Sequence, residues 1–405
     1  MHIALSTSVM QRGKSGVGQY VLALAQAMLR HADEHEFSLF VLEEDMPLFH
    51  FAHGKMGLIP VAEKWRPAVK NIGWHQAILP GLLRGMRADV LHVPSYRRML
   101  GTKPCALVST IHDLAPFHVR GKYDLARMLY GRVAVKWLAR RQDEIIAVST
   151  STAVDIRRFF GIPLDRQNVV LNGVDHERFT VGDAEAARIG AKACYGLDAP
   201  FFLYVSRLEH PAKNHVRLIE AFNAFKQATN SPWLLALGGS DWHGASAIHA
   251  AAQASPFAKD IRFLGFVPDE VLPDLYRAAH AMVYPSLFEG FGLPPIEAMA
   301  CGCPVVSSAR GALQEVIGDA ALRIDPDRVA SISGGLARIA SSPELRRDLV
   351  ARGLANARRF DWNTNADRVL EVYRRAIDAR RAPRRKDAEA AGEAFLQAEL
   401  HSPGT

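Results

Sequence analysis

Short runs of β-branched and other apolar residues alternate with longer stretches of helical periodicity along most of the chain. In the first half, residues 2–7, 37–43, 89–94, 106–113, 144–150 and 168–174 have the length and composition of strands. Residues 18–32 and 123–141, which lie between such runs, have the periodicity of helices. Alternation of this kind predicts βαβ units that build a parallel sheet.

The same alternation repeats in the second half. Strands are predicted at residues 201–207, 233–239, 261–267, 281–286, 304–308 and 321–326, and an amphipathic helix, capped by Asp or Asn, at 361–383. The apolar pattern lapses at residues 172–185, so we predict two doubly wound α/β domains. Their bounds are 1–174 and 175–360, and residues 361–405 form a crossover helix and a charged tail.

A length of 405 residues fits two cores, and the charge is unevenly divided between them. Residues 1–175 hold 22 Lys and Arg against 15 Asp and Glu, a net of +7, whereas residues 176–405 hold 27 of each. A basic half favours an anionic partner: nucleic acid, a membrane surface or a phosphate-bearing substrate. No nucleic-acid-binding motif is present, so we expect no nucleic acid. A basic face that is only solvated and a membrane-docking face both remain open.

Cysteine usage and hydropathy indicate the compartment. No run of 18 apolar residues is long enough to cross a bilayer, and the first residues have the pattern of a buried strand, not of a signal peptide. Four scattered cysteines are typical of reduced thiols in the cytoplasm. Cys301 and Cys303 are spaced as a Cys-x-Cys pair, but nothing nearby completes a metal site, so we expect buried thiols and no metal.

The stretch YPSLFEGFGLPPIEAMACGCPVVSS, residues 284–308, places two carboxylates around a turn. A strand ends near 286 and a helix is predicted to begin at Pro295, so Glu289 lies in the loop and Glu297 in the first helical turn. Ligands of open α/β sheets bind at such strand ends. Gly290 and Gly292 let backbone N–H groups approach a phosphate, and the carboxylates can accept hydrogen bonds from hydroxyls. The unit therefore predicts a site for a sugar nucleotide.

This stretch closely resembles the E-x7-E signature of the retaining family-four glycosyltransferases, and the resemblance extends from SGVGQY (residues 15–20) to the helical C-terminus. It implies the GT-B fold, in which two Rossmann-like domains face a central cleft and C-terminal helices return to the first domain. It implies that Glu289 contacts hydroxyls of the donor sugar and Glu297 those of the ribose. Backbone groups of Phe291, Gly292 and Leu293 would approach the sugar and phosphates.

The resemblance assigns further residues. Arg207 and Lys213, in SRLEHPAKNH after a strand, match the family's diphosphate site, where permanent cations neutralise the leaving group. His112, at the end of a first-half strand, matches a histidine that hydrogen-bonds the transferred sugar. The glycines of the first loop match the family's N-terminal glycine loop, although a plain strand-to-helix turn explains them equally well. Gly16 and Gly18 of that loop are accordingly predicted on the donor side. Independently of the resemblance, Gly265 in FLGFVP is predicted to let the nucleotide base approach its loop.

The interpretation that follows is a metal-independent retaining glycosyltransferase without a cofactor, in which the leaving phosphate helps to deprotonate the acceptor. Similarity to bacterial mannosyl-type enzymes of polysaccharide assembly makes GDP-mannose the first choice of donor and a UDP-sugar the second. The acceptor is predicted to be a saccharide, free or linked to polyprenyl diphosphate, with peripheral contact to the inner face of the cell membrane through the basic first domain. A sugar-nucleotide epimerase and a catalytically silent partner subunit remain alternatives. A phosphorylase would need a longer chain and a lysine that binds pyridoxal phosphate.

Overall fold

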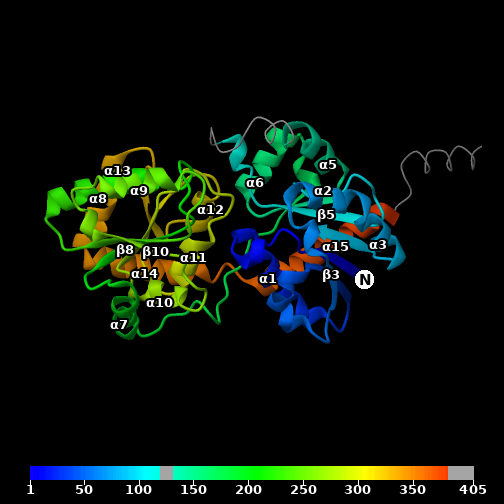
Figure 1. The fold of residues 1–405 in the computed structure, drawn as a ribbon, viewed down its shortest axis with the longest axis horizontal. Helices are drawn as coiled ribbons and strands as arrows, with labels where there is room; N and C mark the ends of the chain where they lie inside the picture. The colour runs from blue at the N-terminus through cyan, green and yellow to red at the C-terminus, as the bar shows by residue number, and fades with distance from the viewer. Residues whose placement is uncertain (119–130, 382–405) are drawn as a thin grey trace, which may run out of the picture.

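Two parallel sheets organise the chain in the computed structural model, which describes residues 1–118 and 131–381 (Figure 1). The first sheet has seven strands in the order β3-β2-β1-β4-β5-β6-β7, and the second has six in the order β10-β9-β8-β11-β12-β13. Every pairing within them is parallel. The α/β class with two Rossmann-like units is thereby confirmed.

The first unit contains the following elements: β1 His2–Ser6, α1 Gly16–Met28, β2 Glu36–Leu42, β3 Gly57–Val61, α2 Ala68–Ala77, α3 Leu79–Gly85, β4 Val90–Val93, β5 Ala106–Ile111, α5 Lys136–Arg141, β6 Glu144–Ala147, α6 Thr150–Asp155 and β7 Gln167–Val169. The predicted strands correspond to all of these strands except β3. That strand lies at the sheet edge, is half-exposed and contains Pro60. Proline cannot donate to a neighbouring strand and is tolerated at an edge, so the strand carries little apolar signal.

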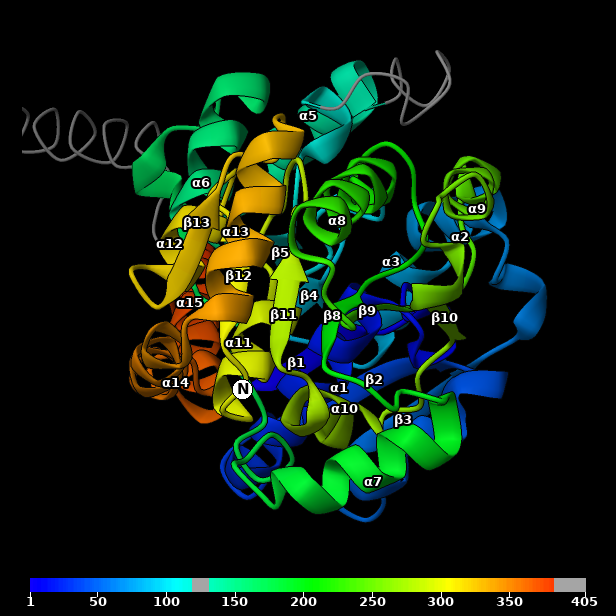
Figure 2. The same ribbon diagram turned by 90° about the vertical axis from the view of Figure 1, so that its left-hand side faces the viewer.

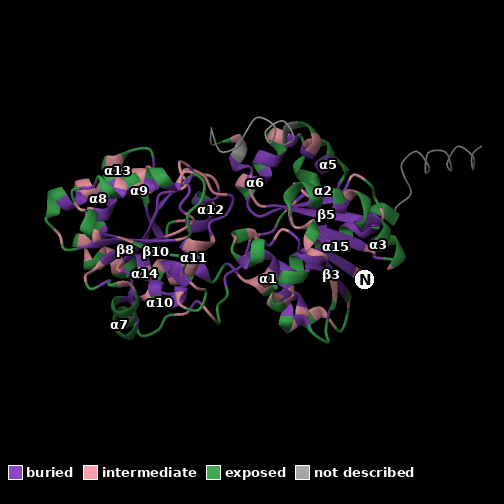
Figure 3. Cartoon of the chain, viewed as in Figure 1, coloured by how far each residue is buried: buried purple, intermediate pink, exposed green. Residues whose placement is uncertain are grey.

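The second unit contains α7 Ala184–Tyr195, β8 Phe201–Val205, α8 His215–Thr229, β9 Leu234–Gly238, α9 Ala245–Gln253, β10 Ile261–Gly265, α10 Leu272–Ala278, β11 Ala281–Tyr284, α11 Leu293–Ala300, β12 Val305–Ser308, α12 Leu313–Ile317, β13 Ala321–Ile324, α13 Val329–Ser341 and α14 Pro343–Ala357. Its six predicted strands are all present. Helices cover both faces of the sheet, with α8, α9 and α13 on one side and α7, α10, α11 and α14 on the other (Figures 1 and 2). The sheet is consequently buried on both faces, as its near-continuous apolar strands require (Figure 3).

The last described helix, α15 Trp362–Arg381, returns to the first unit. It packs on α1, β5 and β6, and its buried residues Val369, Leu370 and Tyr373 join the core beside β1 and β2. The Asp361 carboxylate caps it by accepting from the backbone N–H of Thr364 at 2.7 Å, which confirms the predicted cap. The predicted tail after residue 381, and the first part of the helix predicted at 123–141, lie outside the described residues.

The chain crosses between the units twice, and the two crossings lie side by side. Val174 forms a parallel bridge with Asp361, and its N–H donates to the Phe360 carbonyl at 3.3 Å. A Cβ on Gly173 would lie 2.4 Å from the backbone nitrogen of Trp362, so only glycine permits this approach. The proposed domain limits, 174 and 360, fall at this pair of crossings.

Candidate functional site

The candidate site lies where the strand order of the second sheet reverses. β8 is followed along the chain by β9 and β10 on one side, and the chain then returns to place β11 against the other side of β8. Open α/β sheets bind their ligands at the carboxyl ends of the strands that flank such a reversal, here β8 and β11. Lys213 follows β8, and Glu289 follows β11.

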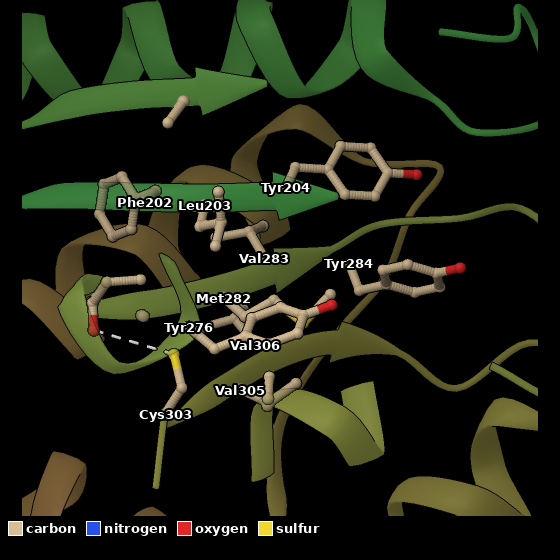
Figure 4. Packing of buried hydrophobic residues seen from close by; sticks show 14 of the residues in the cluster. Phe202, Leu203, Tyr204, Tyr276, Met282, Val283, Tyr284, Cys303, Val305 and Val306 are labelled. Carbon is tan, nitrogen blue, oxygen red and sulfur yellow. Dashed lines mark hydrogen bonds between the residues drawn. The ribbon is translucent and has the colours of Figure 1, made fainter. Parts of the chain in front are cut away.

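Lys213 and Glu289 form an ion pair between the loops that follow β8 and β11. The Lys213 Nζ lies 2.6 Å from the Glu289 Oε1, and the two side chains are only 16% and 14% exposed. The Tyr284 hydroxyl, at the end of β11, donates to the same oxygen at 3.1 Å. Burial and the Glu289 charge raise the pKa of Tyr284 well above its usual value, so the phenol stays a donor. Figure 4 shows the hydroxyls of Tyr204 and Tyr284 at the same end of their strands. The carboxylate of Glu289 is thus held in one orientation.

Glu297 lies further along the same stretch but not where the sequence placed it. Helix α11 begins at Leu293, two residues before the predicted start, because Gly292 adopts a φ of +106° and serves as its N-cap. Glu297 is therefore in the second helical turn. Its Oε2 accepts from the buried Tyr276 hydroxyl at 3.1 Å, and burial raises its pKa to about 7, although the Tyr276 hydrogen bond and the Arg178 charge lower it. The carboxyl is consequently poised to change its charge near neutral pH.

Arg207, expected beside Lys213, is 38% exposed at the carboxyl end of β8. Its guanidinium carbon lies 4.7 Å from the centre of the Trp242 ring, and its Nη2 lies 3.6 Å from the Glu209 carboxylate. The planar group is thus held by a cation–π contact on one face. Arg207 and Lys213 both lie in the loop after β8, where Arg207 contacts Trp242 and Lys213 contacts Glu289.

At Gly290, the loop between β11 and α11 packs against the first unit. Its carbonyl accepts from the Ser149 Oγ at 2.8 Å and from the Thr152 Oγ1 at 3.2 Å, both at the start of α6. A Cβ at this position would lie 1.8 Å from the His112 carbonyl oxygen. Gly290 therefore serves close packing between the two units, and its approach to a ligand stays a prediction.

His112 follows β5 in the first unit, and its backbone carbonyl packs against Gly290 of this loop. Its Nε2 lies 3.2 Å from the Pro94 carbonyl oxygen. Because a carbonyl oxygen can only accept, Nε2 carries the proton and donates it, and Nδ1 of the neutral ring is then an acceptor. Burial lowers the pKa of His112 to about 4, so the ring is neutral at physiological pH. A neutral imidazole with a free lone pair can accept a hydrogen bond from a sugar hydroxyl.

The remaining predicted residues are mostly backbone positions. Gly16 begins α1 after the Ser15 cap, and a Cβ on Gly18 would lie 2.5 Å from the Met10 carbonyl, so the loop's own packing requires Gly18. Gly265 has a φ of +67° and no atom within contact of a Cβ. The Phe291 side chain is buried, Leu293 is half-buried, and both flank Gly292 at the start of α11.

Three aromatic residues of the site were given no role from the sequence: Tyr276, Tyr284 and Trp242. Tyr276 both packs in the core and donates to Glu297, Tyr284 donates to Glu289, and Trp242 contacts Arg207. A tyrosine at a strand end beside a carboxylate was the one signal available for Tyr284. Within residues 1–118 and 131–381, no group of three His, Cys, Asp or Glu side chains could hold a metal ion. Cys301 and Cys303 are buried free thiols, as expected.

Two family descriptions match the two halves of the chain. Residues 14–178 match Glycosyltransferase Family 4, and residues 195–356 match Glycosyl transferases group 1. The chain is 29% identical to O-antigen chain mannosyltransferase B of Escherichia coli, over 92% of this chain and 100% of that protein. It is 32% identical to D-inositol 3-phosphate glycosyltransferase 2 of Catenulispora acidiphila, over 83% of this chain and 87% of that protein.

Solved structures agree on the architecture. The Anabaena protein Alr3699/HepE, solved in complex with UDP and glucose, superposes with a TM-score of 0.72 at 19% identity, over 92% of this chain and 98% of that one. WaaG, a glycosyltransferase involved in lipopolysaccharide biosynthesis, superposes with a TM-score of 0.69 at 16% identity, over 92% of this chain and 99% of that one. Together with the return of α15 to the first unit, these superpositions establish the GT-B fold.

Proposed function

The chain belongs to glycosyltransferase family four, whose members retain the anomeric configuration and generally need no metal, and we propose that it transfers mannose from GDP-mannose to a saccharide hydroxyl. The observation that carries the proposal is the pairing of Lys213 with Glu289 at the reversal of strand order. A nucleotide sugar carries a diphosphate, which can pair with Lys213 in place of Glu289. It also carries sugar hydroxyls, which can donate to Glu289 in place of Lys213. The name of the Escherichia coli relative, a mannosyltransferase of an O-antigen chain, supports the choice of sugar.

In the proposed mechanism the chain supplies position and charge. Arg207 and Lys213 neutralise the diphosphate as it leaves, Glu289 accepts from sugar hydroxyls, and Glu297 accepts from the ribose. His112 accepts from the transferred sugar through Nδ1, across the cleft. Backbone groups at Gly16, Gly18, Gly265 and in the segment 290–293 line the path of the nucleotide sugar. The leaving phosphate takes the acceptor proton, so no protein nucleophile is required.

The donor is tested by thermal stabilisation, because a ligand that binds only the folded state raises its stability. GDP-mannose, GDP, UDP-glucose and UDP are compared with a dTDP-sugar at equal concentrations. We expect GDP-mannose and GDP to raise Tm most, and the Lys213→Met variant to lose most of that shift. Stabilisation by UDP and UDP-glucose alone would overturn the mannose proposal in favour of a UDP-sugar, the donor class bound by the Anabaena relative.

Turnover separates the transferase from its alternatives. With GDP-mannose alone, the protein should release GDP slowly by hydrolysis. Addition of a mannose-containing oligosaccharide as acceptor should accelerate the release of GDP. Conversion of the sugar without release of GDP would indicate an epimerase. Binding without turnover, unchanged in Glu289→Ala, would indicate a silent partner subunit.

We further propose that the acceptor is presented at an anionic membrane, on the cytoplasmic face. On α5, Trp137 is 55% exposed and the Arg141 guanidinium lies 4.8 Å from its ring centre, within the basic half of the chain. Tryptophan favours the bilayer interface, and basic residues add attraction to anionic headgroups. No helix among the described residues could cross a bilayer, so contact would be peripheral.

This contact is tested by sedimentation with vesicles of phosphatidylglycerol and phosphatidylcholine. Binding should need the anionic lipid, weaken at high salt, and fall in Trp137→Ala and Arg141→Glu. The matched control is Arg347→Glu, an exposed arginine of the second unit. Absence of binding, or binding that is insensitive to salt, would refute the membrane part alone.

A further inference from the structure

Four hydrogen-bonded polar side chains form a continuous series through the core of the first unit, and one of them, Tyr20, contacts His112. The Tyr20 hydroxyl of α1 lies 3.1 Å from the Thr110 Oγ1 of β5. That oxygen lies 2.7 Å from the Nε2 of His92 on β4, whose Nδ1 lies 2.7 Å from the Tyr373 hydroxyl of α15. Three hydrogen bonds thus join α1, β4, β5 and α15, and we call these four side chains the Tyr20–Tyr373 chain.

All four members are almost completely buried; none is more than 1% exposed. Burial lowers the pKa of His92 to about 3, so its ring is neutral, with one nitrogen donating and the other accepting. Buried polar groups are costly unless each is satisfied, and apolar side chains of similar volume would pack here without that cost. Such a network therefore constrains orientation more than it adds stability.

The orientation that is constrained is that of Tyr20, which stands between the site and the interdomain crossing. Its ring centre lies 4.6 Å from that of His112 in an edge-to-face arrangement. On another side it lies 5.7 Å from the ring of Trp362, the first residue of α15. The Tyr20 ring consequently forms part of the wall against which the His112 imidazole is set, while the backbone carbonyl of Pro94 fixes its Nε2.

We propose that Tyr20 is a positioning residue for His112, and that the Tyr20–Tyr373 chain holds it in place and ties the sugar-contacting histidine to the crossover helix α15. This rests on the role proposed above for His112. A rotation of the Tyr20 ring would release the imidazole from one wall of its pocket. The sugar contact would then be lost in part, while the nucleotide, bound on the other side of the cleft, would be held as before.

The test uses the full-length protein and the release of nucleoside diphosphate from GDP-mannose, or from UDP-glucose if that is the nucleotide sugar that stabilises the protein. Tyr20→Phe and Tyr373→Phe each remove one hydroxyl from the chain and keep the ring. We expect kcat to fall three- to tenfold with donor KM changed less than twofold. Tyr195→Phe, at a half-buried tyrosine of α7 in the second unit, is the matched control and should leave kcat unchanged.

The decisive measurement repeats Tyr20→Phe in a His112→Gln background. If Tyr20 acts through His112, the second substitution should change kcat less than 1.5-fold there, and the Tyr20→Phe, Tyr373→Phe double variant should resemble the more damaged single variant. An equal loss in both backgrounds, or an unchanged kcat in Tyr20→Phe, would overturn the inference. A normal kcat in His112→Gln itself would refute the role of His112, and the inference with it, while leaving donor binding intact.

Discussion

The carboxyl of Glu297 should make the stability of the protein depend on pH, and Glu297→Gln should remove that dependence. Burial raises its pKa from 4.5 to about 7. Between these values the folded protein keeps a proton that the unfolded chain has released, so the contribution of this group to stability is lost as pH rises. Glutamine retains an acceptor for the Tyr276 hydroxyl but carries no charge.

The magnitude follows from the shift itself. A change from 4.5 to about 7, at about 1.36 kcal/mol per pKa unit, sets an upper limit of about 3.4 kcal/mol for the effect of Glu297 above pH 8. Part of the side chain stays accessible to water, so about 1–2 kcal/mol is the expected range. In a domain of 150–250 residues each kcal/mol moves Tm by about 2–4 °C.

The assay is thermal unfolding of ligand-free wild type and Glu297→Gln at pH 5, 6, 7 and 8. The variant should have nearly the wild-type Tm at pH 5 and exceed it by several degrees at pH 8. Glu344→Gln, at an exposed glutamate of α14, is the control and should follow the wild type at every pH. Parallel curves for Glu297→Gln and wild type between pH 5 and 8 would refute the reasoning, because they would show a carboxyl with an ordinary pKa.

Three further outcomes follow from the site. Lys213→Met leaves the Glu289 carboxylate without its cation and should lower kcat/KM at least 100-fold, about 2.7 kcal/mol, in steady-state kinetics; a loss below fivefold would contradict the diphosphate role. Gly290→Ala puts a methyl group into the His112 carbonyl and should lower kcat/KM more than tenfold. The control, Gly190→Ala on open helix surface, should leave activity unchanged and raise stability by about 0.5–1 kcal/mol. Equal effects of the two substitutions on kcat/KM would contradict the packing argument. Chelation with EDTA should leave donor turnover unchanged, and its abolition would contradict a metal-independent reaction.

Local signals predicted most of the fold. Buried parallel strands are short continuous apolar runs, so twelve of the thirteen strands within the described residues could be located from the sequence, while the half-exposed edge strand that contains Pro60 could not. The start of α11 was misplaced because a proline was taken as the first helical residue, whereas the positive φ of Gly292 sets the start. Both errors concern backbone features that apolar periodicity does not report.

The candidate site was predictable as a set of residues but not as a set of contacts. Lys213 and Glu289 were each assigned a ligand group, yet they are 76 residues apart and their ion pair depends on how β8 and β11 meet. Likewise, no local pattern in the sequence reveals that the Tyr276 hydroxyl donates to Glu297. Distant pairings of this kind require the assembled sheet.

The adjacency of the two interdomain crossings bears on how the enzyme could be rebuilt. Because Val174 is bridged to Asp361, the segment between them enters and leaves the first unit at one point. The second unit can therefore be exchanged as one segment whose two ends are adjacent, while α15 stays with the first unit. The second unit of another family member could replace it with junctions at these two crossings. Gly173 would have to be kept, because its lack of a side chain lets the two crossing segments pack together.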